Sequence, residues 1–184
     1  MIKTHDDLKK CLDIETSGFR KGKLIRYFGW LPMFSCFGES FGIYKLIVFL
    51  RKCEYYTNRG GAFQYLYKLK LKSIENKFNV RIPINVFDIG LQIPHLGPIV
   101  VHPRARIGKN CRIHVGVNIG AEKDLVPIIG DDCYIGPGAK IFGGITIGDR
   151  CKVGANAVVN KSFGSDQTIV GVPGHSILTE TVEE

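Results

Sequence analysis

The sequence lacks an unbroken apolar stretch long enough to cross a lipid bilayer. Its most apolar segment, residues 28–50, is interrupted by Pro32, Glu39 and Lys45. Because a membrane-spanning helix needs about 20 consecutive apolar residues, we expect no transmembrane segment. Peripheral contact of residues 28–50 with a membrane surface stays open as an alternative. Residues 1–10 are polar, which predicts no signal peptide.

The sequence also lacks cysteine pairs with the spacing of a metal or redox site. None of the six cysteines has a second cysteine three positions away. Cys111, Cys133 and Cys151 instead occupy one recurring position of a repeat, where a thiol serves as a small apolar core residue. We therefore expect no bound metal and a reduced, cytoplasmic protein.

The second half of the chain carries no net charge. Residues 81–184 hold 10 Lys/Arg and 10 Asp/Glu, whereas residues 1–80 hold 15 and 7 and so account for the whole net charge of +8. A basic excess can attract nucleic acid, but no nucleic-acid-binding motif accompanies it, and we expect no such partner. An anionic acceptor, a membrane surface or a solvated basic face explains the charge equally well.

The second half contains a repeat of six residues. Ten aliphatic residues recur in one frame, with one interruption, and the position four residues later is mostly small. A short fixed period is typical of a solenoid, in which each coil stacks on the next and buries a continuous core. The aliphatic positions are Val101, Ile107, Ile113, Ile119, Ile129, Ile135, Ile141, Ile147, Val153 and Val159.

Residues 1–80 show no such repeat and are expected to be α-helical. Residues 44–52 and 62–77 read as two helices, and Gly60 and Gly61 form the turn between them. We expect these helices to cap the end of the solenoid or to pack on a partner subunit. The sequence thus predicts an N-terminal helical segment, residues 1–80, and a β-solenoid domain with a short tail, residues 81–184.

Counting six-residue steps assigns the repeats to three faces and places His95 at the head of a column. Three repeats make one coil, so His95 shares its position with Val115, Pro137 and Ala155 in successive coils. Adjacent coils are separated by about 4.8 Å, the spacing of neighbouring strands. A long, thin ligand could lie along this column, with Lys152 and Arg150 near its far end to meet phosphates.

Coenzyme A has that shape, with an extended pantetheine arm and charged phosphates. A histidine can take a proton from an acceptor hydroxyl as the hydroxyl attacks a thioester. Backbone N–H groups could stabilise the resulting oxyanion. The column therefore predicts an acyltransferase site with His95 as general base.

Three segments carry a family resemblance. Residues 93–101 (IPHLGPIVV), 135–141 (IGPGAKI) and 171–173 (GVP) resemble segments of the serine O-acetyltransferases, members of the hexapeptide-repeat proteins with a left-handed parallel β-helix. The resemblance covers about residues 78–178. It implies an acetyl-CoA-dependent O-acetyltransferase that works as a homotrimer. It assigns catalysis to His95, and acetyl-CoA binding to Ala121, Gly136, Pro137, Lys152 and Ala155.

The chain departs from that family where the family binds its acceptor. Val126 precedes Pro127 where the family has a second histidine, and Pro94 stands where it has an aspartate. In the family, an aspartate upstream of the catalytic histidine pairs with it. The matching region of this chain is Asn79 and Val80, which supplies no aspartate. This pattern is more similar to the serine-acetyltransferase-like proteins of capsule and surface-polysaccharide synthesis. We therefore expect a sugar hydroxyl as acceptor, with serine O-acetylation as the alternative.

Other histidines leave further alternatives open. His114 lies one coil along from His95 and is a second candidate catalytic residue. His95, His102 and His114 could instead bind zinc between subunits, as in hexapeptide-repeat proteins of the carbonic-anhydrase type. A purely structural scaffold without acetyl-CoA binding is the third alternative.

Overall fold

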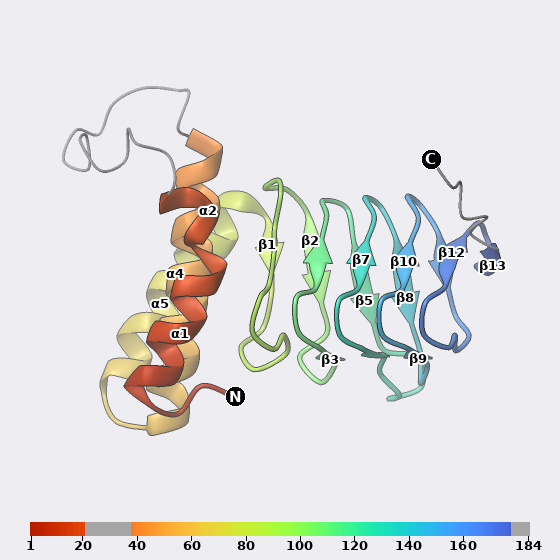
Figure 1. Cartoon of the computed structure of the whole chain (residues 1–184). Coiled ribbons are helices and arrows are strands. Elements are labelled where there is room, and N and C mark those ends of the chain that lie inside the picture. The colour runs from red at the N-terminus through yellow and green to blue at the C-terminus, as the bar shows by residue number, and fades with distance from the viewer. Residues whose placement is uncertain (21–37, 178–184) are drawn as a thin grey trace.

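The computed structural model describes residues 1–20 and 38–177, and it consists of a group of helices followed by a β-solenoid (Figure 1). The helices are α1 (His5–Glu15), α2 (Ser17–Arg20), α4 (Gly38–Arg59) and α5 (Phe63–Phe78). The expected helix of residues 44–52 lies within α4, and that of residues 62–77 matches α5 to within one residue at each end, which confirms both. No helix in the described part of the chain is long and apolar enough to cross a membrane. Residues 28–37, part of the segment considered for peripheral membrane contact, lie outside the described residues.

Local signals set the helix ends. Thr4 caps α1, because its Oγ1 accepts a hydrogen bond from Asp7 N (3.0 Å) and its own N–H donates to the Asp7 carboxylate (2.9 Å). At the other end of the helical region, α5 stops at Asn79, which adopts a left-handed backbone conformation (φ 54°). The chain then turns directly into the first strand.

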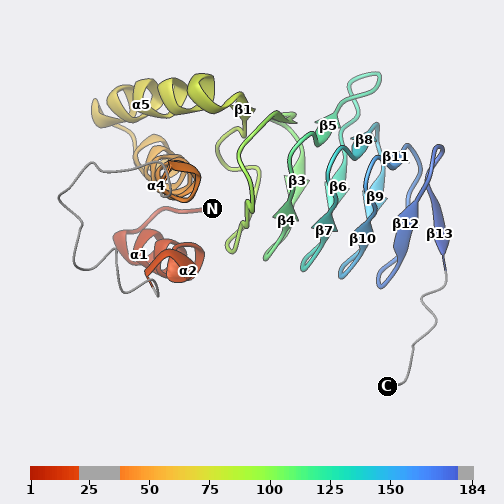
Figure 2. The ribbon, with the colours of Figure 1, turned by 90° about the horizontal axis from the view of Figure 1, so that it is seen from above.

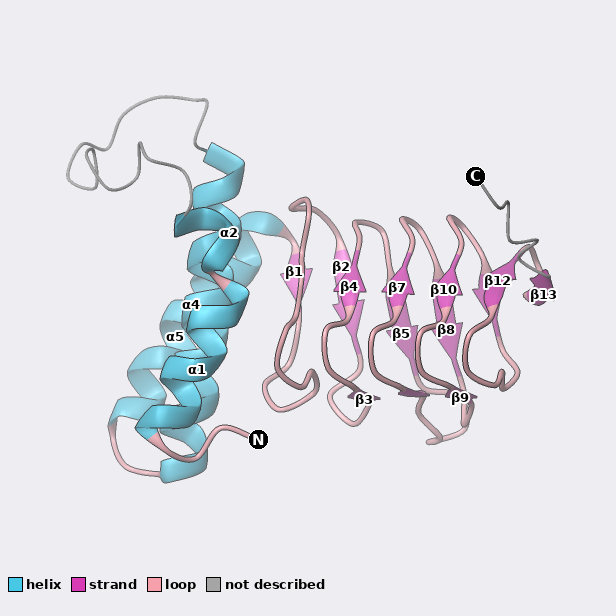
Figure 3. Ribbon diagram, viewed as in Figure 1, coloured by secondary structure: helices cyan, strands magenta, loops and turns pink. Residues whose placement is uncertain are grey.

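The solenoid strands form three sheets that wrap one core, and all pairs are parallel except β12 with β13 (Figure 3). Sheet A has the order β1-β2-β5-β8-β11, sheet B the order β3-β6-β9, and sheet C the order β13-β12-β10-β7-β4. The strands are β1 (Val80–Arg81), β2 (Ile99–Val101), β3 (Arg106–Ile107), β4 (Arg112–Ile113), β5 (Asn118–Gly120), β6 (Ile128–Ile129), β7 (Tyr134–Ile135), β8 (Lys140–Phe142), β9 (Thr146–Ile147), β10 (Lys152–Val153), β11 (Val158–Val159), β12 (Thr168–Val170) and β13 (His175–Ile177).

The strand registers confirm the three faces predicted by counting. In sheet A Val101 pairs with Ile119, Ile119 with Ile141, and Ile141 with Val159. Ile107, Ile129 and Ile147 align in sheet B, and Ile113, Ile135 and Val153 in sheet C. All ten repeat positions are buried, so each coil contributes three aliphatic side chains to a continuous core.

The stack extends beyond the regular repeat at both ends. The first coil contributes Phe87, which pairs with Ile107, and the last contributes Phe163 and Ile169, which align with Ile147 and Val153. The sequence period ends at Val159 because Phe163 follows after four residues instead of six. Strand β13 then pairs antiparallel with β12 and ends the parallel stack.

The cysteines of the repeat are core residues, as predicted. Cys111, Cys133 and Cys151 are buried and carry free thiols. Their thiols face the interior at the corners, where the Cys133 and Cys151 Sγ atoms lie 3.2 and 3.0 Å from the backbone oxygens of Gly148 and Gly164.

The helices close the N-terminal end of the solenoid, which confirms the predicted cap. Ile43, Leu46, Ile47 and Leu50 of α4 and Leu71 of α5 belong to the same buried cluster as the solenoid core. Figure 2 shows this arrangement from above, with α4 between α5 and α1. The cap thereby covers apolar surface that the first coil would otherwise expose to water.

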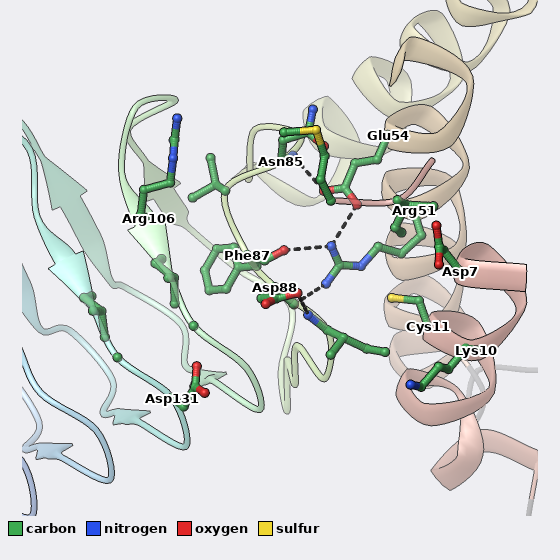
Figure 4. A pocket seen from close by; sticks show the side chains of 18 residues that line it. Asp7, Lys10, Cys11, Arg51, Glu54, Asn85, Phe87, Asp88, Arg106 and Asp131 are labelled. Atoms are coloured by element: carbon green, nitrogen blue, oxygen red, sulfur yellow. Dashed lines mark hydrogen bonds and ion pairs between the residues drawn. The ribbon is translucent and has the colours of Figure 1, made fainter. Parts of the chain in front are cut away.

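A buried arginine joins the helices to the first coil (Figure 4). The Arg51 guanidinium donates to both oxygens of Glu15 (2.9 and 2.6 Å) and to Glu54 Oε2 (2.8 Å). It also donates to the backbone oxygens of Phe87 (3.0 Å) and Asp88 (2.7 Å). A guanidinium has five N–H donors, so all of them are used.

Arg51 and Glu54 line a cleft between the helices and the solenoid, and we assign this cleft a structural role. It has a volume of about 540 Å³ and lies between the helices and the first coils. Its central charge is fully paired within the chain, and burial of Arg51 is offset by Glu15 and Glu54, which keep the pKa of Arg51 above its ordinary value. Neither His95 nor His114 lines this cleft.

Candidate active site

His95 lies on a corner of the prism, between the end of the first coil on sheet C and strand β2 of sheet A. Its side chain is 63% exposed, so a ligand can reach the imidazole from solvent. Two glycines let the His95 segment fit closely between its neighbours. A Cβ on Gly42 of α4 would lie 2.6 Å from Leu96 Cδ1, and a Cβ on Gly97 would collide with Val115 of the next coil. The backbone of α4 can therefore approach the His95 segment.

Glu39, at the start of α4, places a carboxylate beside His95. Its Oε1 lies 3.4 Å from His95 Nδ1 and accepts a hydrogen bond from the backbone N–H of Leu96 (2.8 Å). One carboxylate oxygen thus contacts both the imidazole and the backbone that carries it. A carboxylate on Nδ1 favours the tautomer with a proton there and leaves Nε2 free as a base. The long 3.4 Å separation is typical of a site without its substrate.

No sequence motif identifies Glu39 as a site residue. Glu39 precedes Leu96 by 57 positions and belongs to the helical region, which carries no repeat frame to align it with His95. The region around Asn79 and Val80, where the family resemblance suggested looking for a partner, supplies no carboxylate. The closeness of Glu39 and His95 depends on how α4 docks on the first coil, and no sequence spacing encodes it.

His114 is close enough to His95 for their charges to interact. The His114 ring stacks at an angle on Tyr134, with centroids 4.9 Å apart, and its Nε2 is buried without a hydrogen-bond partner. Burial and the nearby Arg112 charge, together with electrostatic repulsion from His95 when both rings are protonated, lower the pKa of His114, so its ring is mostly neutral at pH 7. The structure therefore brings both predicted catalytic histidines to the same corner.

The predicted column follows from backbone hydrogen bonds between successive coils. Gly116 N–H donates to Pro98 O (2.6 Å), Gly138 N–H to Val115 O (2.9 Å) and Asn156 N–H to Pro137 O (2.9 Å). Each bond connects one coil corner to the next. His95, Pro137 and Ala155 are exposed and Val115 is half-buried, so small side chains line the surface from the imidazole onward.

Two other predicted cofactor residues lie beside this column and differ in exposure. Lys152 of β10 is exposed, and its strand partner in the preceding coil is Tyr134. Gly136 is buried, and a Cβ there would lie 2.8 Å from Val153 O. Its N–H is already bonded to Val153 O, so close stacking alone accounts for this glycine, and its role in cofactor binding stays a prediction.

Ala121 lies on a different corner. It follows β5 and opens the loop of residues 121–127, which connects sheet A to sheet B, whereas His95 stands between sheets C and A. This loop is held by Arg104, whose guanidinium donates to Asp124 O (2.6 Å), and it packs with Leu125 against Gly144. Within one chain, the structure does not bring Ala121 together with His95 and Pro137.

The three histidines considered as zinc ligands do not meet within one chain, because His102 lies apart from His95 and His114. His102 follows β2 toward sheet B, where its Nδ1 accepts a hydrogen bond from Arg104 N (3.2 Å). Residues 1–20 and 38–177 contain no group of three or more His, Cys, Asp or Glu side chains placed to hold a metal ion.

Known proteins similar to this chain are acetyltransferases. Residues 127–161 match the family model described as bacterial transferase hexapeptide (six repeats). A serine acetyltransferase from Staphylococcus xylosus is 41% identical over 91 residues, which are 47% of this chain and 42% of that protein. The chain thus spans less than half the length of the curated relatives that it matches.

Solved structures match nearly all of the chain. A serine acetyltransferase from Neisseria gonorrhoeae in complex with serine matches with a TM-score of 0.69 and 24% identity, over 95% of this chain and 70% of that one. A serine acetyltransferase in complex with CoA matches with a TM-score of 0.69 and 25% identity, over 94% and 71%. The solenoid is therefore a left-handed parallel β-helix of hexapeptide repeats, preceded by helices. None of these similar proteins supports the expected capsule or surface-polysaccharide type.

Proposed function

We propose that this chain transfers the acetyl group of acetyl-CoA to the hydroxyl of a small molecule, with L-serine as the acceptor. The observation that carries the proposal is the exposed imidazole of His95, which heads a column of small side chains and has the Glu39 carboxylate on its Nδ1. The similarity to serine acetyltransferases favours serine over the sugar acceptor expected from the sequence.

The reaction follows from this geometry. Nε2 of His95 takes the proton of the acceptor hydroxyl as its oxygen attacks the thioester carbonyl. The tetrahedral intermediate then breaks its C–S bond, and the imidazolium returns the proton to the departing CoA sulfur. Glu39 holds the ring through Nδ1 and stabilises the imidazolium that forms between the two steps.

The column suits the long arm of CoA. Three coil steps of about 4.8 Å separate His95 from Ala155, so the exposed surface runs for roughly 14 Å from the imidazole. Lys152 stands beside the column and would meet a phosphate at the far end. In this arrangement Pro137 and Ala155 leave room for the pantetheine arm because neither side chain projects far.

We propose a homotrimer as the working assembly. Ala121 and its loop lie on another corner than His95, so they can join this site only from a neighbouring copy of the chain. In the same reading, residues 1–80 are the helical segment and residues 81–184 the acetyltransferase domain. The free buried thiols fit a cytoplasmic location.

A sugar hydroxyl remains the second candidate acceptor for one reason. Pro94 directly precedes His95 and Val126 lies in the loop of residues 121–127, and neither side chain can bind an amino acid through charge or hydrogen bonds. Serine carries two charged groups that need such partners. A neutral sugar has no charged groups and therefore needs no charged partner in the acceptor pocket.

An acceptor comparison tests the proposal. Release of the CoA thiol is followed at fixed acetyl-CoA with L-serine, and in parallel with neutral monosaccharides and nucleotide sugars, and the product is identified by mass spectrometry. We expect kcat/KM to be highest with serine, with O-acetylserine as product. A higher kcat/KM with a sugar than with serine would show that the acceptor is the sugar and not serine. Failure to bind acetyl-CoA in calorimetry, or stoichiometric zinc in the purified protein, would overturn the acyltransferase proposal.

A further inference from the structure

Helix α5 has apolar side chains on two opposite sides. Its inner side packs Tyr67, Leu71, Ile74 and Phe78 against the buried core. Its outer side, here called the α5 face, exposes Tyr65 (65%), Leu66 (44%) and Leu69 (72%) to solvent. These three residues share one side because positions four apart on a helix are neighbours. Isolated exposed apolar residues are common, but a clustered group on one helix face indicates an interaction surface.

Lysines border the α5 face on both sides. At about 100° per residue, Lys68 and Lys72 fall on one flank of the apolar stripe, and Lys70 and Lys77 fall on the other. All four are exposed. The single acidic residue of α5, Glu75, is buried on the inner side of the helix. The α5 face therefore combines an apolar centre with a uniformly positive border.

The α5 face is on the outside of the helical region. Figure 2 shows α4 between α5 and α1, so within the described part of the chain α5 is packed on one side only. Three of the lysines extend over aromatic rings: Lys70 Nζ lies 5.8 Å from the Tyr67 ring centre, Lys68 Nζ 5.8 Å from Tyr65 and Lys77 Nζ 5.4 Å from Phe78. Their long apolar stems lie along the helix, and their charged ends are available at its edges.

We propose that the α5 face binds the surface of an anionic lipid bilayer, with α5 parallel to the membrane plane. Tyr65, Leu66 and Leu69 enter the headgroup region, where apolar side chains leave water, and the four lysines contact lipid phosphates. The proposal is independent of the acetyl-transfer chemistry.

The charge of the α5 face argues against the competing occupants. In a two-fold contact, a second copy of the chain would bring two sets of four lysines together, and like charges oppose that contact. An acidic protein would satisfy the lysines but gives no reason for the exposed apolar stripe between them. A bilayer with anionic headgroups satisfies both features at once.

Vesicle binding tests the proposal. The full chain is titrated with vesicles of phosphatidylcholine alone, and with vesicles that also contain phosphatidylglycerol, and bound protein is measured by sedimentation. We expect binding only to the anionic vesicles, and weaker binding as salt is added. Equal binding to both kinds of vesicle, or binding to neither, would overturn the proposal.

Matched variants locate the contact on α5. Lys68→Gln with Lys72→Gln should weaken binding roughly 30-fold, because each lysine near an anionic surface contributes about fivefold. The control, Lys9→Gln with Lys161→Gln, removes the same charge from exposed positions on α1 and the solenoid and should change binding less than about twofold. Equal losses in the two variants would mean that overall charge, and not the α5 face, drives binding.

The apolar stripe is tested with Leu66→Ser and Leu69→Ser together. Both side chains are exposed, so the helical content measured by circular dichroism should not change. Binding should fall by about tenfold or more, since two leucines no longer leave water. If this variant binds vesicles normally but has a smaller mass than the parent in sedimentation equilibrium, the α5 face is a contact between copies of the chain and the membrane proposal fails.

Discussion

Replacing Arg51 with methionine should strongly destabilise the docking of the helices on the solenoid. The guanidinium makes five hydrogen bonds in the native state, three to the carboxylates of Glu15 and Glu54 and two to backbone oxygens of the first coil. Methionine has a similar length but supplies none of these donors. Two carboxylates with 0% and 2% exposed side chains would then lack their cation.

The magnitude follows from what stays buried. Removal of one partner of a buried ion pair typically costs about 3–5 kcal/mol, because an uncompensated charge is left out of water. Glu15 keeps hydrogen bonds from the backbone N–H groups of Gly90 and Leu91, and Glu54 keeps one from Asn85, so we expect the lower half of that range. Even about 3 kcal/mol is a large part of the 5–15 kcal/mol that holds a typical domain folded.

Urea unfolding at fixed protein concentration, followed by circular dichroism, measures this loss in free energy of unfolding. Asp166→Asn is the matched control: it breaks an ion pair with Arg150 of equal length, 2.6 Å, whose two side chains are 57% and 61% exposed. We expect the control to shift the midpoint little, because exposed pairs contribute little. If the Arg51 variant shifts it no more than the control does, the reasoning about the buried cluster is wrong.

Three further predictions concern the site and the core. Glu39→Gln should lower kcat on the order of tenfold with the KM for acetyl-CoA unchanged, since the ring of His95 loses its orienting carboxylate; restored turnover in Glu39→Asp would support positioning, and an unchanged kcat would refute it. Burial and nearby positive charge lower the pKa of His114 below 6.5 in the folded chain. As pH falls, His114 therefore binds a proton at a higher pH in the unfolded chain than in the folded chain. Stability should therefore be lost as pH falls below about 6.5, and His114→Asn should reduce this slope in unfolding measurements at several pH values; an unchanged slope would contradict the assignment. Burial raises the pKa of Cys133 from 9.0 to about 11, so its labelling by a thiol reagent at pH 8, mapped by mass spectrometry, should be at least about a hundredfold slower in the folded protein than in urea; equal rates would show that the corner thiol is accessible.

Much of the solenoid could be predicted because its six-residue period is visible in the sequence as a repeat of aliphatic residues. An aliphatic residue every sixth position, such as Ile135 and Ile141, is both the repeat and the core, so counting assigned each repeat to its sheet. The same counting placed His95, Pro137 and Ala155 on one corner. It failed after Val159, because the next core residue, Phe163, follows a shorter connection.

The remainder depends on contacts between distant segments. Glu39 approaches His95 only because α4 packs on the first coil, and Arg51 joins α1, α4 and the first coil through atoms far apart in the chain. No local period or motif marks either residue. Family resemblance also does not show which residues meet within one chain. It grouped Ala121 with Pro137, but the two lie on different corners of one chain.

The rate of acetyl transfer by His95→Ala tests the central claim most directly. CoA release is measured with serine as acceptor, and acetyl-CoA affinity is measured separately by calorimetry. The His95 side chain is 63% exposed, so the variant should fold and bind acetyl-CoA with nearly unchanged affinity. Its kcat should fall by about 10²–10⁴, the usual contribution of a general base. A variant that binds acetyl-CoA and keeps most of its kcat would show that His95 is not the base and would move that role to His114.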